Sequence, residues 1–214
     1  MTGVGAMKIP GILAVVAIVL LQGCAFTKAT LDVHASPDVK VAGPLGDVGS
    51  IQLGTPQLED ARLDKARIGW KKNGLGQNSA DITTAEPVDR IVGNAVAKAF
   101  TDTRHTVGDG GRIQVLGTVD RFWFDTDQNF WTVKFIGDVQ CSLEFIDAQT
   151  KQPIYKSKYA GSYSEEKAGG LNKTWAMIMG KALDKLTEDI VLDEKLAAAL
   201  SGWRKGQAAG GNGE

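Results

Sequence analysis

Apolar and polar residues alternate over residues 131–145, and this is the strongest pattern in the chain. The odd positions carry apolar or small residues, while the even positions are mostly polar. Because successive side chains of a strand point to opposite faces, a period of two predicts a long β-strand with one buried face. Residues 113–123 alternate in the same way, and three tyrosines within 155–163 continue the pattern. These segments predict a three-stranded antiparallel meander.

The apolar positions also indicate how the first two strands of the meander pair. Pairing Val115 with Val139 and Val119 with Phe135 keeps both apolar sets on one face of the sheet. A slip by one residue would carry every one of these side chains to the other face. We therefore expect this register.

The remaining elements follow from shorter patterns. Apolar segments at 50–54 and 61–73 predict two earlier strands, and the polar, glycine-containing segment 73–86 predicts a loop. Residues 87–103 and 172–192 have the three-and-four spacing of amphipathic helices. This order predicts an α+β fold, with an antiparallel sheet that includes the meander and two main helices packed on one of its faces.

The N-terminal residues 1–23 have the layout of an export signal. Lys8 supplies a positive charge, residues 9–21 form an apolar run, and Gly23 is a small residue before the cleavage point. A helix that spans a membrane needs about 20 apolar residues. The shorter run favours a signal peptide over a transmembrane helix or a buried core helix.

The order Leu21-Gln22-Gly23-Cys24 resembles the lipobox of bacterial lipoproteins. The resemblance implies that the Cys24 sulfur receives a diacylglycerol, that the leader is removed, and that the new N-terminus is acylated. Two or three acyl chains hold a protein at a membrane far more firmly than one chain does. Because no aspartate follows Cys24 directly, the resemblance also implies the outer membrane of a Gram-negative bacterium, with the domain facing the periplasm.

Composition fits one globular domain with appendages. The chain has 214 residues, of which 43% are hydrophobic and 23% are charged. We expect a lipidated N-terminus and tether at 24–47, a periplasmic domain at 48–203 and a disordered tail at 204–214. The formal net charge is −1, with no cluster of basic residues, so nucleic acid is not an expected partner. With Cys24 lipidated, Cys141 is expected to be an inert buried thiol rather than to pair between molecules.

Further segments resemble the YajG-like bacterial lipoproteins. These segments are LEDAR at 58–62, with its Asp60-x-Arg62 pattern, RIGWKKNG at 67–74, and TVGDGGRIQVLGTVDRF at 106–122. The resemblance extends from about residue 31 to about residue 200. It carries no catalytic signature.

Motifs for catalysis, metals and cofactors are weak. His34 and His105 lack metal-binding spacing and are expected at the surface. The segment GGLNKT at 169–174 lacks a glycine that a phosphate-binding loop needs, and it predicts a helix start instead. The segment DTDQNF at 125–130 begins like a calcium loop, but Phe130 replaces the required glycine, so it predicts a polar turn. We expect no enzyme activity, no cofactor and no metal.

Aromatic residues at the tip of the predicted hairpin are one candidate interaction surface. Phe122 and Phe124 have the parity opposite to the buried face, and Phe130 lies in the turn, whereas Trp131 is expected to face the core. Exposed aromatic groups often mark contact with a partner protein or with lipid headgroups. The alternative is a bulge near Asp120 that turns the phenylalanines inward.

A second candidate is the loop that contains Lys71, Lys72, Asn73 and Asn78. Ammonium and amide groups together have the chemistry to cradle a glycan, such as peptidoglycan, or an anionic group. Loops carry function more often than the scaffold that holds them does. The alternative is a mobile connection between two elements.

These observations favour a non-enzymatic binding or assembly module of the bacterial envelope. Its partners would be the membrane, through the acyl chains, and an envelope protein or glycan; the sequence does not indicate an oligomeric state. An alternative is an accessory lipoprotein of a lipid or polysaccharide transport system. A third is a cell-wall-modifying enzyme, which would need an acid and base pair among Glu165, Glu166 and Asp125.

Overall fold

The computed structural model of the chain describes residues 27–38, 40–128, 131–168, 170 and 172–210. The predicted signal peptide, Cys24 and Phe130 lie outside these residues. In chain order the elements are β1 (Ala29–Leu31), η1 (Pro44–Asp47), β2 (Gln52–Leu53), β3 (Gln57–Asp60), β4 (Gly69–Lys72), β5 (Asn78–Thr84), α2 (Val88–Asp102), β6 (Thr106–Val107), β7 (Ile113–Gln128), β8 (Val133–Asp147), β9 (Pro153–Lys167), α3 (Asn172–Val191) and α4 (Glu194–Gly210).

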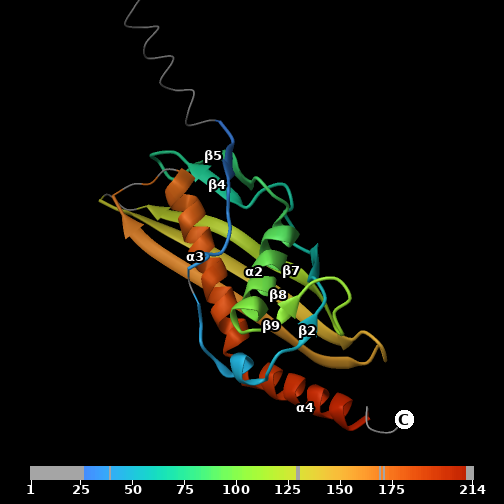
Figure 1. Ribbon diagram of the computed structural model, residues 1–214. Coiled ribbons are helices and arrows are strands. Elements are labelled where there is room, and N and C mark those ends of the chain that lie inside the picture. The colour runs from blue at the N-terminus through green and yellow to red at the C-terminus, as the bar shows by residue number, and fades with distance from the viewer. Residues whose placement is uncertain (1–26, 39, 129–130, 169, 171, 211–214) are drawn as a thin grey trace, which may run out of the picture.

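The described residues form a mixed nine-stranded sheet, and α2 and α3 lie side by side over one of its faces (Figure 1). Strands β7, β8 and β9 are the antiparallel meander. Strands β3 and β4 run parallel to β7, and β1 runs parallel to β5. Helix α4 packs against β9 and η1. The α+β class, the meander and the two main helices are confirmed, and the parallel strands are a feature that alternation does not specify.

The pairing of β7 with β8 differs from the expected register. Val115 lies opposite Phe145, and Val119 lies opposite Cys141. The expected partners, Val139 and Phe135, are therefore each six residues from the true ones. The apolar pattern determines which face is buried, but every even-numbered shift satisfies it equally well.

A β-bulge at Asp120 changes the face of the residues that follow it. The register of β7 against β8 shifts between Val119 and Arg121. The Asp120 carboxylate accepts hydrogen bonds from the Thr118 hydroxyl at 2.8 Å and from the Ser142 hydroxyl at 2.6 Å, which hold the bulge in place. An extra residue in one strand reverses the parity of every position beyond it.

As a result, Phe122 and Phe124 point into the core. Both side chains are 0% exposed. The Phe124 ring lies 5.6 Å from the ring of Trp175 on α3 and 6.3 Å from that of Phe135 on β8, between centroids. The prediction of an exposed aromatic surface is therefore wrong for these two residues, and the bulge is the reason.

The segment predicted to be a tether belongs to the folded body from β1 onward. Ala29, Leu31, Val33 and Leu45 are buried at 5% exposure or less. The Ser36 amide donates a hydrogen bond to Asp184 on α3, at 2.7 Å. The tether predicted for 24–47 is thus wrong over these residues. The Gly and Pro content of the segment is typical of a tether, but its spaced apolar side chains pack into the core.

Three other expected boundaries also change. The predicted loop 73–86 contains β5, because Ser, Thr and Asp on a partly exposed strand have the composition of a loop. The predicted strand 61–73 narrows to the four residues of β4.

The predicted disordered tail 204–214 contains the last two turns of α4, up to Gly210. There the Arg204 guanidinium donates to the Val48 carbonyl, and the Gln207 amide donates to Asp147 at 3.1 Å.

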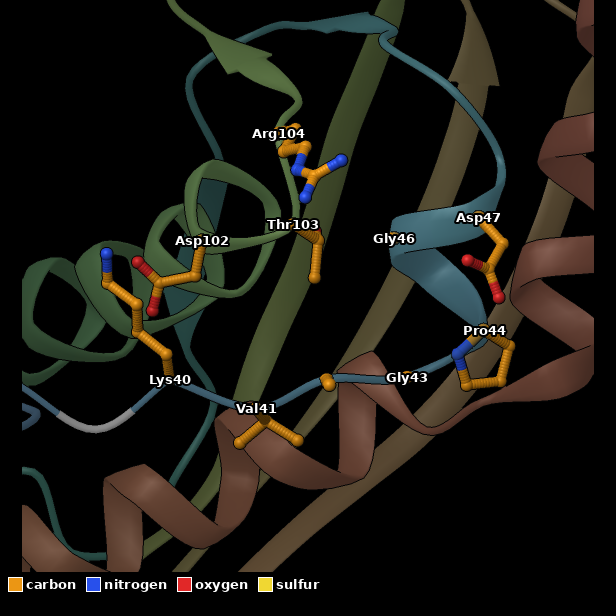
Figure 2. A pocket seen from close by; sticks show the side chains of 10 residues that line it. Lys40, Val41, Gly43, Pro44, Gly46, Asp47, Asp102, Thr103 and Arg104 are labelled. Carbon is orange, nitrogen blue, oxygen red and sulfur yellow. The ribbon is translucent and has the colours of Figure 1, made fainter.

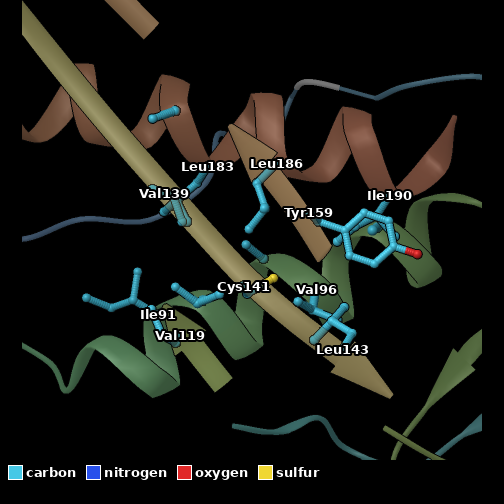
Figure 3. Close-up of a cluster of buried hydrophobic side chains, with 14 of the residues drawn as sticks. Ile91, Val96, Val119, Val139, Cys141, Leu143, Tyr159, Leu183, Leu186 and Ile190 are labelled. Atoms are coloured by element: carbon cyan, nitrogen blue, oxygen red, sulfur yellow. The ribbon is translucent and has the colours of Figure 1, made fainter. Parts of the chain in front are cut away.

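The core lies between β8 and the two helices that cross it (Figure 3). Cys141 sits at its centre and is 0% exposed. Burial raises the pKa of its thiol to about 12, and the negative charges of Asp120 and Asp189 add to this effect. A thiol that stays protonated is a poor nucleophile. The expectation of a buried thiol is confirmed.

Candidate functional site

The Asp60-x-Arg62 pattern forms a crosslink between three segments. Asp60 ends β3, and its carboxylate accepts two hydrogen bonds from the Arg62 guanidinium, at 2.9 Å from Nε and 2.8 Å from Nη2. The third nitrogen, Nη1, donates to the carbonyls of Arg67 and Phe122, at 2.9 Å and 3.3 Å. Arg62 is 7% exposed. The guanidinium therefore holds β3, the segment before β4, and β7 together.

The charge of Asp60 is stabilised within this crosslink. Burial raises the pKa of its carboxyl, but the hydrogen bonds and the positive charge of Arg62 outweigh it, and the net effect lowers the pKa. All three guanidinium nitrogens already donate to groups of the chain itself. The pair acts as a structural element of the fold, and it offers little to a ligand.

The predicted ligand loop is a tight hairpin turn between β4 and β5. The Asn73 side-chain oxygen accepts hydrogen bonds from the amides of Leu75 and Gln77, at 3.0 Å each. The Lys72 ammonium donates to the Asp125 carboxylate at 2.7 Å, which ties the turn to β7. Lys71 and Asn78 flank these two residues on β4 and β5. The structure brings the four residues together, and the side chains of Lys72 and Asn73 bind groups of the chain itself; a glycan or anion cradle stays a prediction.

At the hairpin tip between β7 and β8, Trp131 is exposed. Its side chain is 81% exposed, so the expectation that it faces the core is wrong. Phe130 lies outside the described residues. Strand β7 continues to Gln128, so most of the segment predicted as a polar turn at 125–130 is strand.

The carboxylates proposed for an acid and base pair are not brought together. Glu165 lies 3.2 Å from Lys167 and 3.7 Å from Lys181, whereas Asp125 lies against Lys72. The hydrogen bond from Lys167 lowers the pKa of Glu165, and a general acid at neutral pH needs the opposite shift. Glu166 is exposed on β9.

The two histidines lie in different surroundings, one buried and one at the surface. The Nδ1 atom of His105 accepts a hydrogen bond from the Ile51 amide at 3.2 Å, so its Nε2 carries the proton and donates to the Leu45 carbonyl at 3.1 Å. His105 is 4% exposed, so the expected surface position is wrong, and burial lowers its pKa. His34 lies at the surface, 3.8 Å from Asp32. Over the described part of the chain, no group of three or more His, Cys, Asp or Glu residues is arranged to hold a metal ion.

An open hollow of about 720 Å³ lies between the segment 40–47 and the C-terminal end of α2 (Figure 2). Lys40 and Asp47 line it from the segment, and Asp102 and Arg104 line it from the helix end. Arg104 has a φ of 71°, the left-handed conformation that commonly ends a helix, and the amides of Arg104 and His105 donate hydrogen bonds to the carbonyls of Thr101 and Phe100 at 3.2 Å and 3.0 Å. This helix end forms part of the rim of the hollow.

Sequence reasoning missed this hollow. Its two walls are about 60 residues apart in the chain, and one of them lies in the segment predicted as a tether. The Gly and Pro residues of 43–46 were visible, but nothing in the sequence links them to Arg104. The hollow carries both signs of charge, which suits a polar partner.

A polar cluster around Asp147 attaches α4 to the end of the meander. Asp147 is buried, and its carboxylate accepts hydrogen bonds from the amides of Gln149 and Thr150 and from the indole of Trp203, the last at 2.6 Å. The hydrogen bond from the Thr150 amide has the largest effect on the Asp147 carboxyl, and that from the Trp203 indole has the next largest. Together they hold the pKa of Asp147 at about 2, below the ordinary 3.8.

This lowered pKa predicts a pH-dependent stability. A carboxylate with a depressed pKa in the folded state contributes stability above the unfolded pKa and loses it as pH falls through the folded pKa. We expect Asp147→Asn to flatten the fall in free energy of unfolding between about pH 4 and about pH 2. Urea unfolding at several pH values measures it. Asp109→Asn, in an exposed turn, is the matched control, and an unchanged slope in Asp147→Asn would contradict the assignment.

Comparison with known families decides which kind of protein this is. The profile of the family Lipoprotein_16, described as uncharacterized lipoprotein, matches residues 52–201. The chain belongs to this lipoprotein family. No curated protein matches the chain. In the described part of this family member, no helix is both long and apolar enough to cross a membrane.

Solved structures show the same fold in another protein. The crystal structure of XCC0632 from Xanthomonas campestris has a TM-score of 0.52 and 15% sequence identity, and the match covers 85% of this chain and 99% of that one. PelC from Paraburkholderia phytofirmans, a dodecamer, matches with a TM-score of 0.33 and 13% identity, over 69% of this chain and 92% of that one. Lipoprotein GNA1162 from Neisseria meningitidis matches with a TM-score of 0.25 and 11% identity, over 64% and 96%. Only the first supports a shared fold.

Proposed function

We propose that this family member is a lipid-anchored module of the bacterial envelope that acts by binding rather than by catalysis. Acyl chains on Cys24 hold it at the outer membrane, with the domain in the periplasm, and its finer relationship is to the YajG-like lipoproteins. The family match over residues 52–201 is the observation that carries the proposal. The lipobox at 21–24 supports it, because it places a modifiable cysteine shortly before β1.

The binding role rests on the surface of the described domain. The hollow of Figure 2 is open and carries charges of both signs. Such a surface suits a polar envelope partner better than an acyl chain. Two of the three carboxylates considered for catalysis, Asp125 and Glu165, are each paired with a lysine.

Metabolic labelling tests the anchor. We expect radiolabelled palmitate to enter the wild-type chain and not Cys24→Ala, because the sulfur is the acceptor. The wild type should fractionate with outer membranes on a density gradient, and Cys24→Ala should leave the membrane fraction. An unlabelled wild type, or a variant that stays with membranes, would overturn the anchor.

The same cells test the binding role. A photo-crosslinking amino acid in place of Arg104 should give one defined crosslinked species in intact cells, which mass spectrometry identifies. The same group in place of the exposed Lys156 on β9 is the matched control and should not give that species. Failure of both positions to crosslink would remove the hollow as the binding surface while leaving the anchor in place.

A further inference from the structure

The first strand shows at which end of the domain the lipidated cysteine lies. Strand β1 runs parallel to β5, with Ala29 opposite Ile82. The chain before Ala29 therefore comes from the side where β5 begins, at Asn78. Asn78 directly follows the turn 73–77, and Ala29 pairs four residues further along β5, so the N-terminal segment approaches the sheet from the side of this turn.

The reach of the N-terminal segment is short. Cys24 precedes Thr27, the first described residue, by three positions. A fully extended chain spans at most about 3.6 Å per residue, so the two Cα atoms are within about 11 Å of each other. Acyl chains on Cys24 thus keep this end of the domain close to the bilayer.

Two of the most exposed apolar side chains lie at the same end. Strand β4 runs parallel to β7, with Gly69 opposite Phe124, so both strands end on the same side of the sheet (Figure 1). Beyond β4 lies Leu75, which is 83% exposed, and beyond β7 lies Trp131, which is 81% exposed. We call the turn 73–77 together with Trp131 the anchor end.

Other exposed apolar side chains lie elsewhere and serve as references. Leu63 is fully exposed but follows β3, whose Asp60 pairs with Val119 near the middle of β7. Leu192 is 48% exposed and directly precedes α4, at the opposite end of the fold (Figure 1). Exposure alone therefore does not define a membrane contact; nearness to the anchor distinguishes Leu75 and Trp131.

We propose that the anchor end lies against the membrane surface, with Leu75 and Trp131 in the headgroup region. This inference rests on the proposed acylation of Cys24. Tryptophan favours the boundary between water and hydrocarbon because its ring is large and apolar and carries one polar N–H. The strands of the meander then stand away from the bilayer, because β7 has 16 residues and extends about 50 Å at roughly 3.3 Å per residue. The orientation directs α4 into the periplasm.

Fluorescent labels on the full-length acylated protein test this orientation. Single variants Leu75→Cys, Trp131→Cys and Leu63→Cys are labelled with the environment-sensitive dye NBD. Cys24 is blocked by its lipid, and Cys141 is 0% exposed, so only the new thiol reacts. The labelled proteins are reconstituted into vesicles of phosphatidylethanolamine and phosphatidylglycerol, with no other protein present, and vesicle flotation is measured alongside the emission.

The expected result is that all three proteins float and that emission rises severalfold on vesicle binding for labels at 75 and 131, with no rise at 63. Spin-labelled lipids should quench the first two labels only. If the proteins float and the labels at 75 and 131 behave like the one at 63, the orientation is overturned while the anchor holds. A rise at 63 equal to that at 75 would also overturn it, because the domain would then lie on its side. Proteins that do not float overturn both the anchor and the orientation.

Discussion

Replacing Arg62 by alanine is expected to lower the free energy of unfolding by about 3 kcal/mol. The substitution leaves the Asp60 carboxylate, whose side chain is 20% exposed, without its bidentate partner. It also removes the donor from the carbonyls of Arg67 and Phe122. Removing one partner of a buried pair is costly because the other charge stays in a poorly solvated place. Chemical denaturation measures the loss.

Matched variants separate the geometry of this pair from its charge. Arg62→Lys keeps the charge but lacks the planar fork, so we expect it to recover only part of the stability. Lys156→Ala breaks a surface pair with Glu144, at 3.4 Å, and should change stability by less than about 1 kcal/mol. An Arg62→Ala protein as stable as Lys156→Ala would show that the crosslink does not stabilise the fold.

Gly161→Ala is expected to destabilise the protein by about 3 kcal/mol, because helix α3 crosses β9 directly over this residue. A Cβ atom at position 161 would lie 2.1 Å from the Ala182 carbonyl oxygen and 2.3 Å from the Leu186 nitrogen. Both contacts are with helix backbone, which cannot move aside as a flexible side chain can. The helix must shift away from the sheet, and the packing of the core beneath it loosens. Thermal and urea unfolding measure the effect.

Gly202→Ala is the control for this substitution. Gly202 lies within α4, and a Cβ atom there would meet no atom within 4 Å. Alanine is the better helix former, so this variant should gain up to about 1 kcal/mol. Equal effects of the two substitutions would contradict the close approach of α3 to β9.

The sequence allowed the main elements to be predicted where the apolar period is long. The alternation within 131–145 corresponds to β8, and the stripes within 87–103 and 172–192 correspond to α2 and α3. The prediction succeeds for long periodic segments because the burial of one face contributes most of the free energy that stabilises them. The register failed because Val115 finds an apolar partner on the same face at either Val139 or Phe145.

The change of face at Asp120 had a visible signal. Asp120 and Arg121 are two consecutive polar residues in the middle of an alternating strand, and such a pair marks a possible phase change. A single sequence does not distinguish this from one polar residue on the buried face. The Thr118 and Ser142 hydroxyls that hold the bulge lie on two different strands, so the pairing must be known first.

The hollow beside α2 was beyond sequence reasoning for a different reason. Its walls meet because Leu45 is buried and accepts a hydrogen bond from His105, a contact across 60 residues. Local composition shows only that 40–47 contains Gly and Pro. A feature that is formed by packing between distant segments produces no periodic pattern of apolar residues in the sequence.

The pairing of β1 with β5 has a mechanical consequence. A pull on the N-terminal segment acts along the length of β1, so the paired positions at Ala29, Thr30 and Leu31 share the load in shear instead of opening in turn. Resistance to force depends on the rate of unfolding, and sharing the load slows that rate. Because Ala29 and Leu31 are buried core residues, tension on the N-terminal segment passes into the body of the domain through these three paired positions.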